Sequence, residues 1–379
     1  MIRIKILILA MAVSAAIFAQ SEADYNPITT ATPFLSISPE SRGSAMGDAG
    51  AATSADVYSQ YWNPAKYAFI EDQFGLGLAY TPWLRELVND IGLIDVVGYY
   101  RFDETQTISG SLRYFSLGEI QWTDESGVNQ GMIMPNEFSI DLAYSRKFSE
   151  NWSGSVAPRF IRSDLYSGYG EDGAYPGNAF AVDVAAYYHK EDVYIGDYQS
   201  RYAFGMNLSN IGSKISYDKG STRYFLPANM KLGASLELDI DDYNSIMATV
   251  DINKLMVPTP QNVDSLDAEY NDMGSLEGLF TSFGDAPGGL KEELQEIMYS
   301  VGIEYTYDDS FFVRGGYFYE HENKGNREFF SVGAGFKMNV FALDVSYLVP
   351  TSATSPLANT LRFSLSFGVD GLAHVFGQK

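Results

Sequence analysis

The chain has 379 residues, no cysteine, and 48 acidic against 25 basic residues, a formal net charge of −23. This acidic balance argues against nucleic acid or anionic lipid as the main partner, and the lack of cysteine excludes disulfides and a lipoprotein anchor. Aromatic residues make up 15% of the chain, a share that suits the aromatic girdles of membrane barrels.

Residues 1–19 have the pattern of a secretory signal peptide. Arg3 and Lys5 precede a short apolar stretch that ends at Phe18, and a small residue follows. The stretch is too short to span a membrane, and no later apolar run approaches the roughly 18 residues that a spanning helix needs. We therefore expect an exported chain that keeps 23 basic and 48 acidic residues after processing.

The segment from Arg42 to Ala65 is rich in small residues, with nine Gly or Ala among its 24 positions. Such a segment has too little side-chain volume for a core of its own, and its glycines disfavour a free-standing helix. Small residues suit a backbone that must approach its surroundings closely. We predict that residues 20–73 form an N-terminal segment and a hatch held in a confined space.

From Phe74 onward, apolar and polar residues alternate with period two, which is typical of strands with two different faces. Most of these runs are about ten residues or longer, enough to cross a bilayer at a tilt. An even number of strands can close without leaving an unpaired edge in lipid. Fourteen runs are predicted, at 74–82, 92–102, 105–117, 136–149, 151–165, 177–190, 199–210, 227–239, 243–254, 297–308, 310–320, 326–338, 340–350 and 358–369.

The links between these runs differ in length according to whether they follow an even-numbered or an odd-numbered strand. Links after even-numbered strands are mostly tight turns, whereas links after odd-numbered strands include long stretches such as 118–135 and 255–296. A large soluble β-protein has no reason for this separation, but an outer-membrane barrel has short periplasmic turns and long external loops. We therefore predict an all-β, fourteen-stranded antiparallel transmembrane barrel over 74–369, with the hatch in its lumen. Loops are expected at the cell surface, both termini in the periplasm, and a short tail at 370–379.

The strand faces opposite the apolar residues carry charges of both signs. Ion pairs between strands and with the hatch can satisfy many of them, although a substrate-conducting ladder of charges is the alternative. Either way, these charges count against a passage for apolar molecules. The predicted inward residues are Asp95, Arg101, Arg113, Asp141, Arg159, Asp183, Arg201, Lys231, Glu237, Asp251, Glu304, Arg314, Lys337, Asp344 and Arg362.

No motif in the chain points to catalysis. The three histidines, His189, His321 and His374, have no serine or second histidine at a spacing that strands would bring together. We expect them to be surface or girdle residues. Metal-ligand spacing is absent, and the glycines from Gly43 to Gly50 lack the Lys-Ser/Thr ending of a phosphate loop. We expect no catalytic residue, cofactor or metal, although distant strands could still assemble a hydrolase site.

The longest loop, residues 255–296, carries nine acidic residues and one basic residue. Leu290, Leu294 and Ile297 follow a helical spacing, which predicts a short amphipathic helix leading into the next strand. Four further apolar residues either pack against neighbouring loops as a lid or form a docking element for another protein. These candidate docking residues are Leu276, Leu279, Phe280 and Phe283.

Residues 26–65 carry a family resemblance. Arg42-Gly43-x-Ala45-Met46-Gly47-x-Ala49, Asp56 and Tyr61-Trp62-Asn63-Pro64-Ala65 resemble the hatch of FadL-like outer-membrane barrels, and Asn63-Pro64-Ala65 matches their NPA signature. Fourteen strands is also the barrel size of that superfamily. Within it, the chain resembles the PorV (LptO) family of the type IX secretion system. Two tracts carry this narrower likeness: Asn26-Pro27-Ile28-Thr29-Thr30-Ala31-x-Pro33-Phe34-Leu35 and Ser38-Pro39-Glu40-Ser41-Arg42.

The resemblance implies a non-enzymatic transport component in the outer-membrane lipid. Such proteins bind exported cargo through its C-terminal β-sandwich sorting domain and collect it at the SprA/Sov translocon. They deliver it to an attachment complex with PorU, PorQ and PorZ. Two alternatives stay open: a FadL-type channel for hydrophobic small molecules, which needs an apolar lumenal pocket, and a lipid-modifying enzyme, which needs a nucleophile within about 3 Å of a base.

Overall fold

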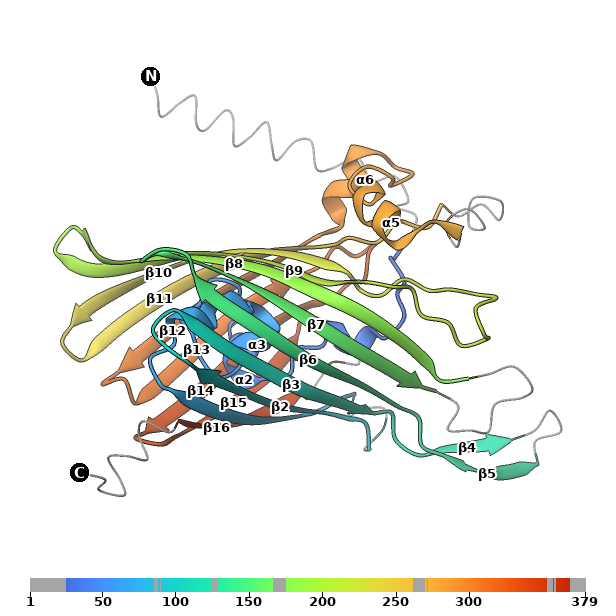
Figure 1. Cartoon of the computed structure of the whole chain (residues 1–379), viewed down its shortest axis with the longest axis horizontal. Coiled ribbons are helices and arrows are strands. Elements are labelled where there is room, and N and C mark those ends of the chain that lie inside the picture. Colours follow the sequence, from blue (N-terminus) through green and yellow to red (C-terminus); the bar gives the residue numbers. More distant parts are fainter. Residues whose placement is uncertain are drawn as a thin grey trace.

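Fourteen strands form one closed antiparallel barrel in which β1 pairs with β16 (Figure 1). The structure is a computed structural model. It describes residues 25–84, 88, 90–123, 128–165, 175–261, 270, 272–352, 357 and 359–368. The predicted signal peptide, 1–19, and the predicted tail, 370–379, lie outside the described residues.

Each predicted run corresponds to one barrel strand, so the fourteen-stranded prediction is confirmed. The largest difference is at β8 and β9, where residues predicted as a loop extend the ladder as far as the pair Ile195–Tyr198. The barrel strands are β1 (Phe74–Pro82), β2 (Gly92–Arg101), β3 (Gln106–Ser116), β6 (Asn136–Lys147), β7 (Trp152–Asp164), β8 (Gly177–Ile195), β9 (Tyr198–Gly212), β10 (Asn229–Asp241), β11 (Asn244–Leu255), β12 (Ile297–Tyr307), β13 (Phe311–Tyr319), β14 (Glu328–Met338), β15 (Phe341–Pro350) and β16 (Leu361–Gly368).

Two predicted loops contain structure of their own. The loop 118–135 holds a small separate hairpin of β4 (Ile120–Thr123) and β5 (Asn129–Ile133). The loop 255–296 holds α5 (Ser275–Thr281) and α6 (Leu290–Gln295), so the helix predicted to lead into β12 is present. The hairpin was missed because its strands are too short to give a clear alternation.

The barrel wall has an apolar outer face and a polar inner face. On β3, Ile108 and Leu112 are exposed, whereas Ser109 and Ser111 between them are buried. Exposed apolar side chains recur in this way on strand after strand, which is the pattern of a wall that meets lipid. Within the described residues, no helix is both long and apolar enough to cross a bilayer.

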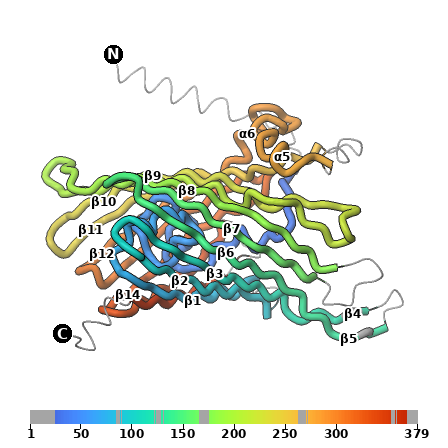
Figure 2. Tube along the Cα trace, in the orientation of Figure 1, coloured from blue at the N-terminus to red at the C-terminus, as the bar shows by residue number. Residues whose placement is uncertain are grey.

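The N-terminal region fills the lumen, which confirms the predicted hatch. Residues 41–70, called the hatch below, contain the short elements α2 (Ser41–Ala45), α3 (Ser59–Trp62) and η2 (Pro64–Phe69). Figure 2 shows this segment in blue inside the ring of strands. The helical turns form here because the barrel wall supplies the packing that their glycines and small residues lack.

Residues 25–37, called the strap, lie at the end of the barrel that carries the long loops. The Asn26 N–H donates to the Asn323 carbonyl at 2.9 Å, and the Ala31 N–H donates to the Phe225 carbonyl at 2.9 Å. The strap also contains η1 (Pro33–Ser36), whose Phe34 is buried in an apolar cluster of the wall. The strap therefore covers the side of the hatch that faces the long loops.

The first and last described residues lie at opposite ends of the barrel, whereas the two termini, which were predicted to be periplasmic, lie outside the described residues. Asn26 is at the long-loop end, whereas the Gly368 N–H donates to Val340 at the short-turn end at 2.9 Å. The hatch thus passes through the lumen before β1 begins. Its residues show no periodicity from which the direction of this passage could be predicted.

Candidate functional site

Trp62 is the centre of the hatch. Its buried ring lies between Gly43 and Gly50, where an added Cβ would stand 2.5 Å and 2.4 Å from ring atoms. The indole N–H donates to the Glu40 carboxylate at 2.7 Å, and the same carboxylate accepts from the Gly43 N–H and caps α2. The small residues of this motif are therefore required because the Trp62 ring occupies the space of their side chains.

The Asn63-Pro64-Ala65 triplet joins the hatch to the wall. The Asn63 amide donates to the carbonyls of Ala51 at 2.9 Å and Ala186 at 3.0 Å, which lie on the hatch and on β8. Its side-chain oxygen accepts from the Ala65 N–H and caps η2, where Pro64 takes the first position. Ala65 is fully buried. Each residue of the triplet thus has a structural reason to be of its type.

Glycines on the inner face of the wall let the hatch backbone come close. A Cβ on Gly205 would stand 1.9 Å from the Ala51 carbonyl oxygen, and one on Gly316 would stand 2.1 Å from the Gly47 nitrogen. Gly47 itself has a φ of +70°, and its own Cβ would meet the Tyr317 backbone at 2.5 Å. The hatch and the wall therefore both lack side chains where their backbones meet, as the small residues of the hatch predict.

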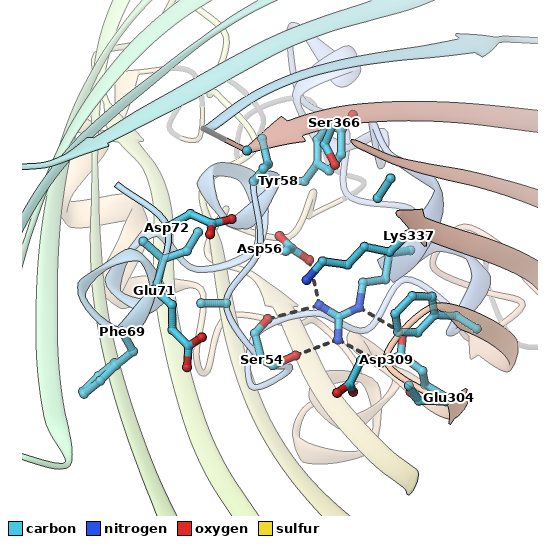
Figure 3. A pocket seen from close by; sticks show the side chains of 18 of the residues that line it. Ser54, Asp56, Tyr58, Phe69, Glu71, Asp72, Glu304, Asp309, Lys337 and Ser366 are labelled. Carbon is cyan, nitrogen blue, oxygen red and sulfur yellow. Dashed lines mark hydrogen bonds and ion pairs between the residues drawn. The ribbon is translucent and has the colours of Figure 1, made fainter. Parts of the chain in front are cut away.

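Two ion-pair networks fix the hatch to the wall. Arg42 binds Glu304 with two hydrogen bonds, of 3.0 Å and 2.9 Å, and Asp56 with one of 2.9 Å. Glu304 also pairs with Arg314, which in turn pairs with Asp344. Figure 3 shows Ser54, Asp56 and Glu304 converging on this point.

The second network lies on β6, β7 and β8. Arg159 pairs with Asp141 at 3.2 Å and with Asp183 at 2.9 Å, and the hatch residue Gln60 donates to Asp141 at 3.1 Å. Asp251 on β11 adds a third contact by accepting from the Gly50 and Ala51 N–H groups. Many of the predicted inward charges therefore pair with one another or hold the hatch. Met46 of the motif is buried beside Met247.

A cavity of about 560 Å³ lies under the hatch at the short-turn end. We call it the vestibule; its lining includes Asp56 of the hatch, Glu71 and Asp72 before β1, and Lys337 on β14. His189 also lines it, with its ring 4.0 Å from that of Phe69. The expectation of a surface or girdle position for His189 is therefore wrong, because this ring turns inward and packs on the hatch.

The loop 255–296 is called the lid, and glutamates in and just after α6 tie this helix to the barrel. Lys254 pairs with Glu293 at 3.2 Å and also with Glu296. Lys324, in the loop between β13 and β14, pairs with Glu292 at 2.6 Å and with Glu296 at 3.1 Å. Asn26 of the strap donates to Glu292 at 3.0 Å, so the lid, the strap and the neighbouring loop share one polar network.

The apolar residues of the lid divide into two groups. Leu279 packs against the cluster that contains Phe225 and Val257, as expected of a lid residue. Phe280 and Leu290 are 74% and 76% exposed. The exposed group comprises Leu276, Phe280, Phe283, Leu290 and Leu294. Helix α6 is thus inverted: its glutamates are turned toward the protein and its leucines toward the outside, which helical spacing alone cannot show.

The lid network should respond to pH through Asp285. This carboxylate accepts from the Thr259 N–H at 3.0 Å, but burial, together with Glu293 and Glu296, raises its pKa from 3.8 to about 6. A raised pKa contributes stability that is complete below the unfolded value and is lost as pH rises through about 6. We expect trypsin to cleave the lid faster at pH 7.5 than at pH 5 after correction for the enzyme's own pH profile. Asp285→Asn should remove most of this difference, and an unchanged difference would contradict the assignment.

Comparison with solved structures shows the fold. The Pseudomonas putida toluene transporter TodX has a TM-score of 0.51 at 10% identity, over 91% of this chain and 99% of TodX. The Ralstonia pickettii toluene transporter TbuX has a TM-score of 0.44 at 13% identity, over 86% and 95%. A Pseudomonas aeruginosa FadL homologue has a TM-score of 0.44 at 12% identity, over 90% and 98%. The likeness to TodX shows that the two chains share a barrel fold, and at this identity nothing more follows.

Comparison with sequence families gives the assignment. No curated protein matches the chain significantly in sequence. The family described as type IX secretion system protein PorV matches residues 20–262, which include the strap, the hatch and the barrel strands through β11. Because this match covers more than half of the chain, the chain belongs to the PorV family of type IX secretion system proteins.

Proposed function

We propose that this barrel binds exported cargo at its long-loop end and carries it from the translocon to the attachment complex. Membership of the PorV family makes the chain an outer-membrane component of the type IX secretion system. The observation that supports a docking role is the inverted helix α6, which exposes Leu290 and Leu294 while its glutamates bind Lys254 and Lys324. A helix that faced only water would expose its glutamates and bury its leucines.

The proposed orientation places the long loops at the cell surface and the short turns in the periplasm. In this orientation the lid faces the cargo's C-terminal sorting domain, and the partners are the SprA/Sov-type translocon and the PorU, PorQ and PorZ attachment proteins. The hatch and strap support this role, because a lumen filled by the protein's own chain suits a docking platform better than a pore. The NPA and glycine motifs then serve to seal the barrel.

The exposed lid residues can supply substantial binding energy. Burying one large apolar side chain that was exposed contributes about 1.5–3 kcal/mol. Interfaces concentrate their energy in a few such anchors surrounded by polar residues. The two helices of the lid and Phe283 between them offer five anchors within a loop that is otherwise acidic, so a partner with an apolar centre and a basic rim fits this surface.

The lid can be tested by removing its exposed apolar side chains. We expect the triple variant Leu276→Ser, Phe280→Ser and Leu290→Ser to lower crosslinked recovery of cargo sorting domains from intact outer membrane at least tenfold. The loss follows from removing three anchors, each worth about a factor of ten or more in affinity. Heat-modifiable migration of the barrel should stay unchanged, because these side chains are largely exposed.

A matched control uses exposed apolar residues at the same end but outside the lid. Ile120, Met132 and Met134, on or beside the β4–β5 hairpin, are also exposed, and their replacement by serine should leave recovery unchanged. Equal losses in the two triple variants would contradict a specific role for the lid.

The alternative, a FadL-type channel, requires an apolar pocket beside the hatch. The large cavity that the structure describes there is lined instead by charged residues, including Arg42, Glu304 and Lys337. The likeness to TodX is one of fold and carries no substrate with it. Uptake of toluene by vesicles that contain this protein, at a rate that depends on the hatch, would favour the channel over the docking role.

A further inference from the structure

The vestibule differs from the rest of the lumen in its charge balance. Eight carboxylates line it, against four Lys or Arg side chains. Most of the cations are already used, because Arg42 and Arg314 pair with Glu304 and Arg201 pairs with Glu237. The cavity therefore keeps an excess of four negative charges that its own permanently charged cations do not balance.

Three of these carboxylates stay free to meet a partner. Among the ion pairs of the described residues, none involves Glu71, Asp72 or Asp309. Figure 3 shows Glu71 and Asp72 on one side of the vestibule and Asp309 on another, so these carboxylates lie on two sides of the cavity. Opposed carboxylates around one cavity attract a cation and repel an anion.

The aromatic lining already contacts cationic groups, which belong to this protein. Phe69 and Phe312 line the vestibule, and both already carry a cation of this protein: Lys147 Nζ lies 4.9 Å from the Phe69 ring centre, and the Arg314 guanidinium lies 4.9 Å from that of Phe312. Aromatic faces next to carboxylates form a standard site for ammonium and guanidinium groups. A volume of about 560 Å³ suits several side chains rather than a single ion.

We propose that the vestibule binds a lysine- or arginine-bearing peptide segment of a partner protein that approaches the short-turn end. The hatch closes the opposite side of the cavity, so the segment enters only from this end. The basic side chains lie between Glu71, Asp72 and Asp309, while their aliphatic stems contact the aromatic lining. This inference does not rest on the proposed cargo role, because the lid lies at the other end of the barrel.

The test measures binding of capped pentalysine to the full-length protein in detergent by isothermal titration calorimetry. Pentalysine should bind at least tenfold more tightly than capped pentaglutamate, and its affinity should fall as salt rises from 50 to 300 mM. The double variant Glu71→Gln, Asp72→Asn should weaken pentalysine binding about tenfold, because it removes two of the free carboxylates. The double variant Glu104→Gln, Glu150→Gln removes the same charge from short turns outside the vestibule and should change affinity less than about twofold.

A second readout places the ligand inside the cavity. The chain has no cysteine, so Ser366→Cys introduces a single thiol in the vestibule wall. Bound pentalysine should slow alkylation of this thiol at least fivefold, and pentaglutamate should not. Equal weakening by the two double variants, or no protection of the thiol, overturns the proposal. Neither outcome bears on cargo capture at the lid, so the two proposals fail separately.

Discussion

Replacing Gly316 with alanine is expected to displace the hatch from its position in the lumen and make the barrel conduct ions. The added Cβ would stand 2.1 Å from the backbone of Gly47 and Met46, and backbone cannot rotate away as a flexible side chain can. Either the hatch moves inward or β13 distorts, and overpacking of this kind costs about 1–3 kcal/mol or more. The measurements are conductance in planar bilayers, which should rise severalfold, and proteolysis of the hatch, which should become faster.

The neighbouring glycine gives a matched control. An alanine at Gly315 would have its Cβ no closer than 3.9 Å to the Ser331 oxygen, which is ordinary contact. The two variants therefore make the same chemical change at adjacent positions of β13, but only one meets the hatch. Gly315→Ala should conduct as little as the wild type. If both variants conduct alike, the close approach of the hatch backbone to β13 is not what holds the hatch in place.

The barrel was predictable because its information is local. Every strand must present apolar residues to lipid at alternate positions, so each run shows the period by itself, and the closing count follows from adding the runs. The lengths of the links then separated a membrane barrel from a soluble β-protein. The β8–β9 hairpin shows the limit: its ladder continues past the apolar pattern, where polar residues such as Glu191 and Asp192 no longer mark a strand.

For the interior of the barrel, only the kinds of contact could be predicted. Small residues and inward charges indicated close approach and ion pairing, but the partners depend on how distant segments meet. The space between Gly43 and Gly50 is filled by Trp62, which no local pattern connects to them. Likewise, the spacing of Leu290 and Leu294 identifies an apolar helix face but not its direction, which Lys254 and Lys324 decide by binding the opposite face.

The second large effect is expected at Arg42. Arg42→Met leaves Asp56 without its cation and Glu304 with only Arg314, inside a network whose side chains are largely shielded from water. Removing one member of a buried pair costs about 3–5 kcal/mol, because the remaining charge stays desolvated. We expect a loss near 3 kcal/mol for the hatch, since the Asp56 side chain keeps 24% exposure at the vestibule. Hydrogen exchange of the hatch amides measures it.

Two further variants show whether the loss of hatch stability comes from the carboxylate that is left without its cation. Asp56→Asn in the Arg42→Met background should restore part of the protection, because it removes the carboxylate that Arg42 had balanced. Arg201→Met removes a pair with Glu237 in which the arginine is 40% exposed, against 14% for Arg42, and should cost under about 1 kcal/mol. A similar loss at Arg201 and Arg42 would mean that burial does not set the strength of the Arg42 contact. The hatch would then be held mainly by its glycine contacts, and Gly316→Ala would remain the only one of the two substitutions able to open the barrel.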